Sequence, residues 1–168
     1  MRITEITEPV TFKVAAPAAF SPAELAAILE LIQSESQVAA AGLLNRIKQS
    51  KLISIAIAQG KIVGISALKI PNNSYKQSVF ANAGVPELAT QFPYEMGWKV
   101  VLPEYRGQAL GLQLSQRLLS SVNIKQVFAT VRSTNQSALK PMQQLGFAPL
   151  GNTFTGSSGN KIILLTVQ

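Results

Sequence analysis

The order of apolar and polar residues predicts five helices. Ser21, followed by Pro22 and Glu24, is typical of a helix start, because a hydroxyl and a carboxylate at this spacing cap amides that the helix leaves unpaired. Apolar residues then recur at helical spacing, which predicts that one face packs inward. A short helix is predicted that Ser74 to Gln77 cap and Gly84 ends. The other predicted helices cover residues 38–49, 110–121 and 135–145.

Runs of β-branched and apolar residues predict strands between these helices. Two runs, residues 52–58 and 62–70, are separated by Gln59 and Gly60, which predicts an antiparallel hairpin. Other strands are predicted over residues 2–6 (continuing to 10–14), 94–102 and 126–132, and as a closing hairpin of 153–154 with 162–167. This order predicts an α/β (α+β mixed sheet) fold, with a central mixed sheet of about six or seven strands flanked by helices.

The length and composition fit a single domain over residues 1–168. The chain has no Cys and no His, and all eight acidic residues are Glu. This composition excludes a disulfide, a thiolate nucleophile and a Ser-His-Asp triad, and we expect no metal site. No apolar run approaches the about 18 residues of a membrane span, and the opening residues lack a signal-peptide core. We therefore expect a cytoplasmic protein with no membrane partner.

The net charge of +7 raises the question of a nucleic-acid partner. The 15 Lys and Arg residues are scattered along the chain, without interleaved aromatic residues, so we expect no nucleic-acid binding. A basic surface also suits a polyanionic small ligand.

Residues 100–112, VVLPEYRGQALGL, predict a strand that ends at Pro103, a tight turn and an immediate helix. A helix start in such a turn leaves backbone N–H groups unpaired and pointing one way, with the positive end of the helix dipole behind them. These features predict an anion site that suits phosphates.

Two motifs carry a resemblance to a known family. The first is the turn RGQALG after VVLPEY, and the second is NQSA at residues 135–138 followed by LGF at residues 145–147. In this order and spacing they resemble the GNAT superfamily of acyl-CoA-dependent N-acetyltransferases. Two residues depart from the family pattern. Ala109 stands at a glycine position, where binding should survive if φ is not positive, and Met142 replaces a Tyr that protonates the leaving thiolate in many relatives.

The resemblance implies acetyl-CoA (coenzyme A) as the acyl donor. Its pyrophosphate would be held by the turn and the start of the helix, with the participating residues Arg106, Gly107, Gln108, Ala109, Leu110, Gly111 and Leu112. The side chain of Arg106 is alternatively a solvated side chain in a turn. The pantetheine arm would pair with the backbone of Val100, Val101 and Leu102. Asn135 would hydrogen-bond the same arm, or would simply cap its helix.

Glu95 is the candidate catalytic base. On a regular strand it shares a face with Gly97 and Lys99, while Tyr94, Met96, Trp98, Val100 and Leu102 share the other. Gly97 would leave open space for a substrate beside Glu95. The alternative is a surface Glu paired with Lys99. Tyr75, Tyr94 and Trp98 are predicted to bind the acceptor, although Trp98 also fits a core position.

The predicted function is N-acetyl transfer from acetyl-CoA to a small-molecule or peptide amine by direct attack in a ternary complex, since no Cys is present to carry an acyl intermediate. The alternative is a non-catalytic acyl-CoA-binding module that acts as a sensor or scaffold, which Met142 and the lack of His and Asp favour. The missing Gly-x-x-x-x-Gly-Lys-Ser/Thr pattern argues against a nucleotide site. The resemblance is also compatible with a homodimer.

Overall fold

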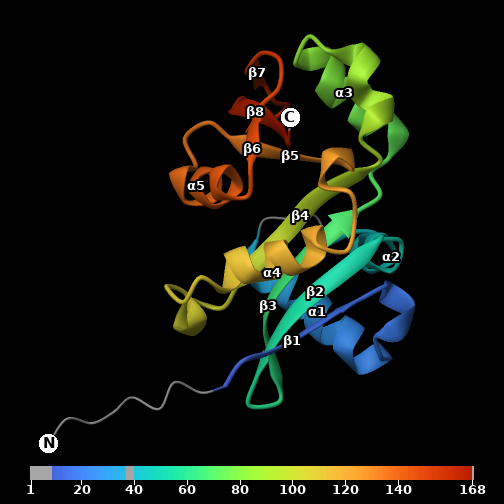
Figure 1. Ribbon diagram of the computed structural model, residues 1–168. Helices are drawn as coiled ribbons and strands as arrows, with labels where there is room; N and C mark the ends of the chain where they lie inside the picture. Colours follow the sequence, from blue (N-terminus) through green and yellow to red (C-terminus); the bar gives the residue numbers. More distant parts are fainter. Residues whose placement is uncertain (1–8, 37–39, 168) are drawn as a thin grey trace, which may run out of the picture.

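A computed structural model describes residues 9–36 and 40–167. It has one mixed sheet of eight strands, with helices against both faces (Figure 1). The predicted fold class is confirmed. The expected strand at residues 2–6 lies outside the described residues.

The sheet has the strand order β1-β2-β3-β4-β5-β8-β6, and β7 also pairs with β8. The pair β4–β5 is parallel and the other pairs are antiparallel. The three-residue strand β6 was not predicted, because a segment this short carries no alternation. The bounds are Thr11–Ala15 (β1), Leu52–Ala58 (β2), Lys61–Lys69 (β3), Tyr94–Val101 (β4), Val127–Arg132 (β5), Phe147–Pro149 (β6), Phe154–Thr155 (β7) and Lys161–Val167 (β8).

Each of the five predicted helices has a counterpart. The start of the first is capped as predicted: the Ser21 hydroxyl accepts from the Glu24 amide, and the Glu24 carboxylate accepts from the Ser21 amide. The third is capped two residues earlier than predicted, by Asn72 rather than Ser74. The bounds are Pro22–Glu35 (α1), Leu43–Lys48 (α2), Asn73–Asn82 (α3), Leu110–Leu119 (α4) and Gln136–Gln144 (α5). Short 3-10 helices cover Pro17–Ala19, Pro86–Gln91, Pro103–Tyr105 and Ile124–Gln126.

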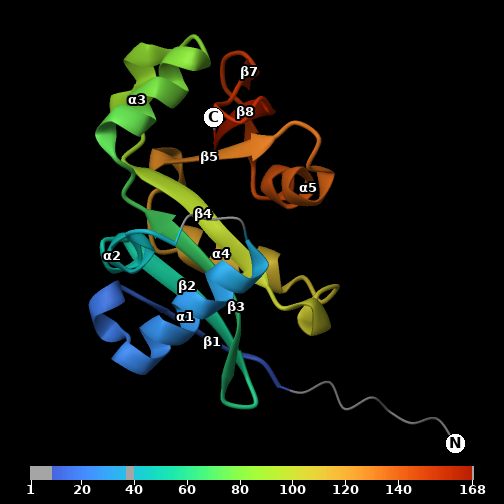
Figure 2. The ribbon, with the colours of Figure 1, turned by 180° about the vertical axis from the view of Figure 1, so that it is seen from behind.

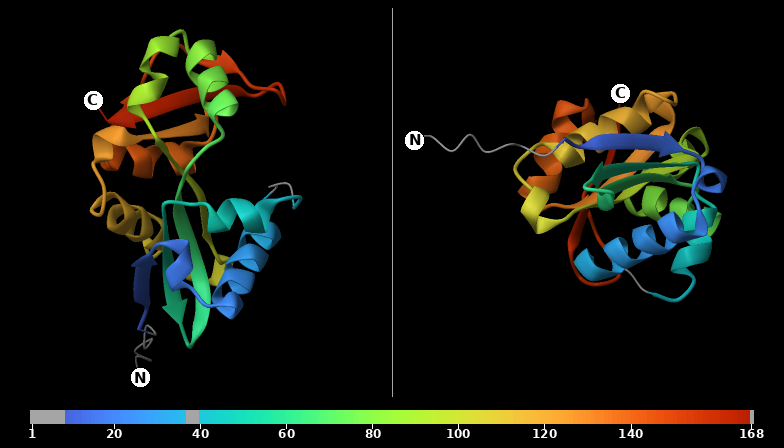
Figure 3. Two further views of the ribbon diagram at one scale, coloured as in Figure 1. Left: turned by 90° about the vertical axis from the view of Figure 1, so that its right-hand side faces the viewer. Right: turned by 90° about the horizontal axis from the view of Figure 1, so that it is seen from below.

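Helices α1 and α4 lie on opposite faces of the sheet (Figure 3, right). On the α1 face, buried Ile28 and Ile32 pack with Ile65 of β3. On the other face, Leu118 of α4 packs with Leu68, three residues after Ile65 on β3. Burial of both sheet faces explains why β2 and β3 are apolar almost without interruption.

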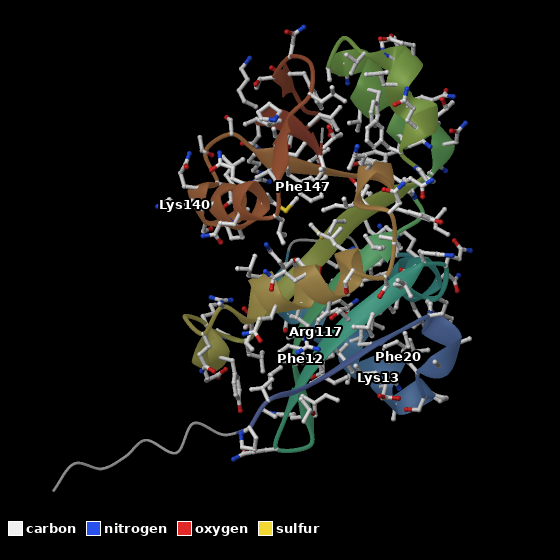
Figure 4. All side chains as sticks on the ribbon, in the orientation of Figure 1. Phe12, Lys13, Phe20, Arg117, Lys140 and Phe147 are labelled. Atoms are coloured by element: carbon white, nitrogen blue, oxygen red, sulfur yellow. The ribbon has the colours of Figure 1, made fainter. Side chains whose placement is uncertain are left out.

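Strand β1 shows how alternate residues serve the two faces. Arg117 of α4 lies over the ring of Phe12, with 4.0 Å between the guanidinium carbon and the ring centre (Figure 4). On the α1 side, Lys13 forms an ion pair with Glu24 at 3.3 Å and lies 4.4 Å from the centre of the Phe20 ring. Neighbouring residues of β1 thus bind opposite helices.

Strand β4 carries a bulge. Gly97 pairs with Ala67 and Val100 pairs with Ile65, so three steps on β4 match two on β3. Trp98, inside the bulge, has a φ of +49°. The predicted regular alternation along β4 is therefore wrong beyond Gly97.

The extra residue changes which side chains share a face. Trp98 and Val100 both pack with the cluster under α1, whereas regular alternation predicts them on the face of β4 that does not carry Glu95. Lys99 instead lies beside the start of α4, where a methyl group on Gly111 would be 3.5 Å from its Cδ.

Strands β4 and β5 separate soon after they meet. They pair through Tyr94 with Val127 and Glu95 with Phe128, and no further pairing joins them within the described residues. Figure 2 shows β5 running away from β4 beyond this contact. The edge of β4 that faces β5 therefore lacks a strand partner from residue 96 onward, in the described part of the chain.

Candidate active site

The turn before α4 presents a run of unpaired amides. Among the described residues, the N–H groups of residues 107–112 (the phosphate turn) donate to no acceptor. The next amide, that of Gln113, donates to the carbonyl of Ala109 at 3.0 Å. Because this is the positive end of a ten-residue helix, the site suits an anion.

Two left-handed residues shape this turn. Gly107 has a φ of +81° and Ala109 a φ of +58°. The condition expected for Ala109, a φ that is not positive, is therefore not met. Alanine pays a steric cost in this conformation that glycine avoids, while its amide remains unpaired.

The side chain of Arg106 is 57% exposed yet has two partners in the protein. Its Nε donates to the Val101 carbonyl at 3.0 Å, and its Nη2 lies 2.9 Å from an oxygen of Glu35, the last residue of α1. Arg106 thus fixes the turn to the end of β4 and to α1, which neither interpretation of the sequence had anticipated.

Lys99 places a positive charge next to the phosphate turn. Its stem lies beside Gly111, and burial lowers the pKa of its ammonium group below the usual value. The hydrophobic pattern does not predict this position, since it follows from the bulge in β4.

Glu95 is buried, with 3% of its surface exposed. Its Oε2 accepts a hydrogen bond of 2.7 Å from the Tyr75 hydroxyl, and its Oε1 lies 3.1 Å from Lys69 Nζ. The alternative of a surface Glu paired with Lys99 is therefore wrong. Glu95 pairs with Lys69, because these residues stand opposite each other on β4 and β3.

The space beside Gly97 is not open. A Cβ there would lie 2.9 Å from Lys69 Cε, so the Lys69 stem fills the room that the glycine leaves. The Lys69 ammonium also lies 5.1 Å from the centre of the Trp98 ring. Lys69 is thus held between a carboxylate and an aromatic face.

Tyr75 reaches Glu95 from α3. Burial of its hydroxyl, and then the neighbouring charge of Glu95, raise the pKa of the Tyr75 phenol well above its ordinary value. A hydrogen bond with Thr130 acts in the opposite direction. Tyr75 therefore remains a proton donor to the carboxylate at neutral pH.

A pocket of about 560 Å³ surrounds these groups (the Glu95 pocket). Its size falls in the range of small-molecule sites, which is roughly 300–1,000 Å³. It contains one acidic and two basic side chains. The lining residues come from α2 and the residue after it, from β3 and the segment that follows, from α3 and from β4: Arg46, Gln49, Lys69, Ile70, Pro71, Asn72, Tyr75, Glu95 and Trp98.

The predicted acceptor residues divide between two places. Tyr75 and Trp98 line the Glu95 pocket, and Trp98 also packs against the core under α1. Tyr94 does not belong to this pocket, because it packs with the cluster on the opposite face, where Lys51 Nζ lies 5.8 Å from its ring centre. Its place next to Glu95 in the sequence puts it on the other side of the sheet.

Asn135 caps α5. Its Oδ1 accepts from the Ala138 amide at 3.2 Å and from the Ser137 hydroxyl at 2.8 Å, so the helix-cap interpretation is confirmed. Met142 is buried in the cluster between α4 and α5, with 4% of its surface exposed.

Solved structures of acetyltransferases share this architecture. The acetyltransferase of the GNAT family from Streptococcus pneumoniae matches 95% of this chain and 100% of that chain, with a TM-score of 0.63 and 15% identity. The chain has the GNAT fold. The ribosomal-protein-S18-alanine N-acetyltransferase from Escherichia coli matches 94% of this chain and 93% of its own, with a TM-score of 0.64 and 14% identity.

The NatC complex bound to Gag peptide and CoA also contains the GNAT fold. The match covers 94% of this chain and 97% of that chain, with a TM-score of 0.65 and 13% identity. Sequence comparison finds no matching family model and no matching curated protein.

The described residues contain no group of three or more His, Cys, Asp or Glu that could hold a metal ion. No helix in the same residues is long and apolar enough to cross a membrane.

Proposed function

We propose that this protein transfers an acetyl group from acetyl-CoA to an amine, by direct attack in a ternary complex. The observation that carries the proposal is the run of six unpaired amides in the phosphate turn, on the segment that follows β4. The Glu95 pocket, on the same strand, supplies a place for the amine.

The phosphate turn fits the pyrophosphate of coenzyme A. Each hydrogen bond from an amide to a charged oxygen contributes about 1.5–3 kcal/mol, so several converging donors give substantial affinity. The unpartnered edge of β4 fits the pantetheine arm, which would add to the sheet through the backbone of Val100 and Val101. The predicted pairing with the Leu102 amide is wrong, because this amide donates to the Val63 carbonyl of β3 at 2.9 Å. The GNAT-fold chain of the NatC complex, solved with CoA, supports this choice of ligand.

Glu95 would act as the base. A primary amine reaches the pocket mostly as an ammonium ion and must lose a proton before it can attack. Oε2 is already engaged by Tyr75, whereas Oε1 has an ion pair with Lys69 at 3.1 Å but accepts no hydrogen bond from the described residues. Oε1 is therefore the atom that would take the proton.

Acetyl-CoA would supply the acyl group as a thioester. The amine nitrogen bonds to the carbonyl carbon and the carbon–sulfur bond breaks. Of the two protons that the ammonium nitrogen loses, one ends on the thiol and one in solvent. Met142 cannot deliver the proton to sulfur, since a thioether has none to give.

A non-catalytic coenzyme A-binding protein is the second candidate. The observation that favours it is the Lys69 side chain, which pairs with Glu95 and fills the space beside Gly97. A carboxylate that kept this partner would be a poor base.

Thiol release distinguishes the two candidates. Calorimetry first establishes acetyl-CoA binding, and release of free coenzyme A is then followed against a broad panel of amines. Turnover that depends on an amine supports acetyl transfer. Binding without turnover for any amine leaves the non-catalytic function, and no binding at millimolar ligand overturns both.

A further inference from the structure

We propose that the acceptor is an amino acid, which binds the Glu95 pocket as a zwitterion. This inference rests on the proposed function and specifies its substrate. Its basis is the ion pair between Glu95 and Lys69, both of which line the pocket.

The ion pair between Lys69 and Glu95 marks the place for the substrate ammonium. Lys69 Nζ lies 3.1 Å from Glu95 Oε1, the oxygen proposed to take the proton from the amine. An entering ammonium group must occupy the position that Lys69 Nζ holds. Lys69 can give way, because its side chain is flexible and 27% exposed.

Displacement leaves Lys69 without its carboxylate partner. A carboxylate on the substrate itself restores that partner, so a zwitterion replaces one internal ion pair with two intermolecular ones. A plain amine restores nothing, and a polyamine adds further positive charge beside the displaced Lys69 ammonium group. Because the Lys69 ammonium group and the Glu95 carboxylate lie only 3.1 Å apart, a substrate with its carboxylate close to its amine is favoured.

Part of the pocket lining is apolar. Ile70, which is 57% exposed, Pro71 and Trp98 all line the pocket. These residues suit an aliphatic or aromatic side chain on the amino acid. The N-acetyl amino acid forms by the same balance of bonds and protons given above.

Matched acceptors test the inference. Leucine and phenylalanine are each compared with their amides and with the amines left by decarboxylation, and spermidine is the polycation. The amide is less basic than the amino acid and the decarboxylated amine is more basic, so the two together control for basicity. We expect kcat/KM for thiol release to be at least tenfold higher for the amino acids than for either analogue.

Variants then assign the preference to Lys69. In Lys69→Met the preference should fall to near unity while the coenzyme A affinity stays unchanged, and Lys69→Arg should keep most of it. Lys140→Met, on the exposed side of α5, is the matched control. The comparison of acceptors uses the unaltered protein, so that part of the test does not depend on the folding of any variant.

The results separate the inference from the proposed function. Equal or faster turnover of the amides, amines or spermidine overturns the amino-acid assignment and leaves acetyl transfer intact. A preference that Lys69→Met retains also overturns it. No thiol release with any acceptor, while acetyl-CoA binds, overturns acetyl transfer and the acceptor assignment with it.

Discussion

The phosphate turn and the Glu95 pocket differ in the groups that they present. The turn uses backbone amides, which any residue with the right φ supplies, and so it tolerates Ala109 in place of a glycine. The pocket depends on three side chains from different elements, Tyr75 of α3, Lys69 of β3 and Glu95 of β4. A site built from backbone amides therefore tolerates substitution unless the new side chain brings bulk or charge into it. A site built from side chains can lose its function when a single side-chain atom is replaced.

The largest expected effect is in the pocket. Glu95→Gln keeps the shape of the side chain but removes the base, so thiol release should fall by about 10²–10⁴-fold. The acetyl-CoA affinity, measured by calorimetry, should change less than twofold because the turn is intact. Glu87→Gln, on an exposed glutamate, is the control. Unchanged turnover in Glu95→Gln would remove Glu95 from the mechanism.

A charge placed in the turn should reverse this pattern. Gly111 lies in the first turn of α4, at an ordinary φ and with room for a Cβ, so Gly111→Glu should fold. Blocking two amide hydrogen bonds should weaken coenzyme A binding by about 100-fold. Gly111→Gln separates bulk from charge. Full affinity in a folded Gly111→Glu protein would contradict the position of the phosphate turn.

Tyr75→Phe should affect stability. It removes the hydrogen bond to a buried carboxylate, which should lower the free energy of unfolding by about 1–3 kcal/mol. The raised pKa of Tyr75 means that the folded state holds its proton longer than the unfolded state. This contribution is complete below about pH 10 and is lost as the pH rises above it.

Urea denaturation measures this pH dependence. The difference in unfolding free energy between the unaltered protein and Tyr75→Phe should be constant from pH 7 to 9 and should shrink above pH 10. A difference that grows with pH would contradict the raised pKa.

The smallest expected effect is a gain in the stability of the folded protein. Ala109→Gly relieves the left-handed conformation, partly offset by the greater freedom of glycine in the unfolded chain, and should stabilise the protein by about 0.5–1 kcal/mol. Thermal unfolding should show a midpoint higher by about 2 °C. Ala26→Gly, in the middle of α1, should lower the midpoint instead. A lower midpoint for Ala109→Gly would mean that the alanine methyl is favourable where it stands.

The contrast between the sites also explains what could be predicted from the sequence. The phosphate turn depends on adjacent residues, and its strand, turn and helix follow from one segment of 13 residues. The partners of Glu95 could not be predicted in this way. Tyr75 lies 20 residues before it and reaches it through the docking of α3, and Lys69 faces it through the register of β3 with β4.

Two errors share one local cause. Regular alternation put Lys99 beside Glu95 and Trp98 on the opposite face, and the bulge in β4 exchanges these positions. A single extra residue in a strand leaves no mark on the hydrophobic pattern, because neither neighbouring side chain needs to change type.

The bulge in β4 directs the side chains of Trp98 and Lys99 to different faces of the sheet. Trp98 lines the Glu95 pocket, the proposed acceptor site, and Lys99 lies beside the phosphate turn, the proposed coenzyme A site. The distance between the two sites is thus set by adjacent residues of one strand rather than by the packing of separate elements. A regular strand of the same length would exchange the two, placing the Trp98 indole on the α4 face and the Lys99 ammonium group beside Glu95, so a change that removes the bulge should alter both sites at once.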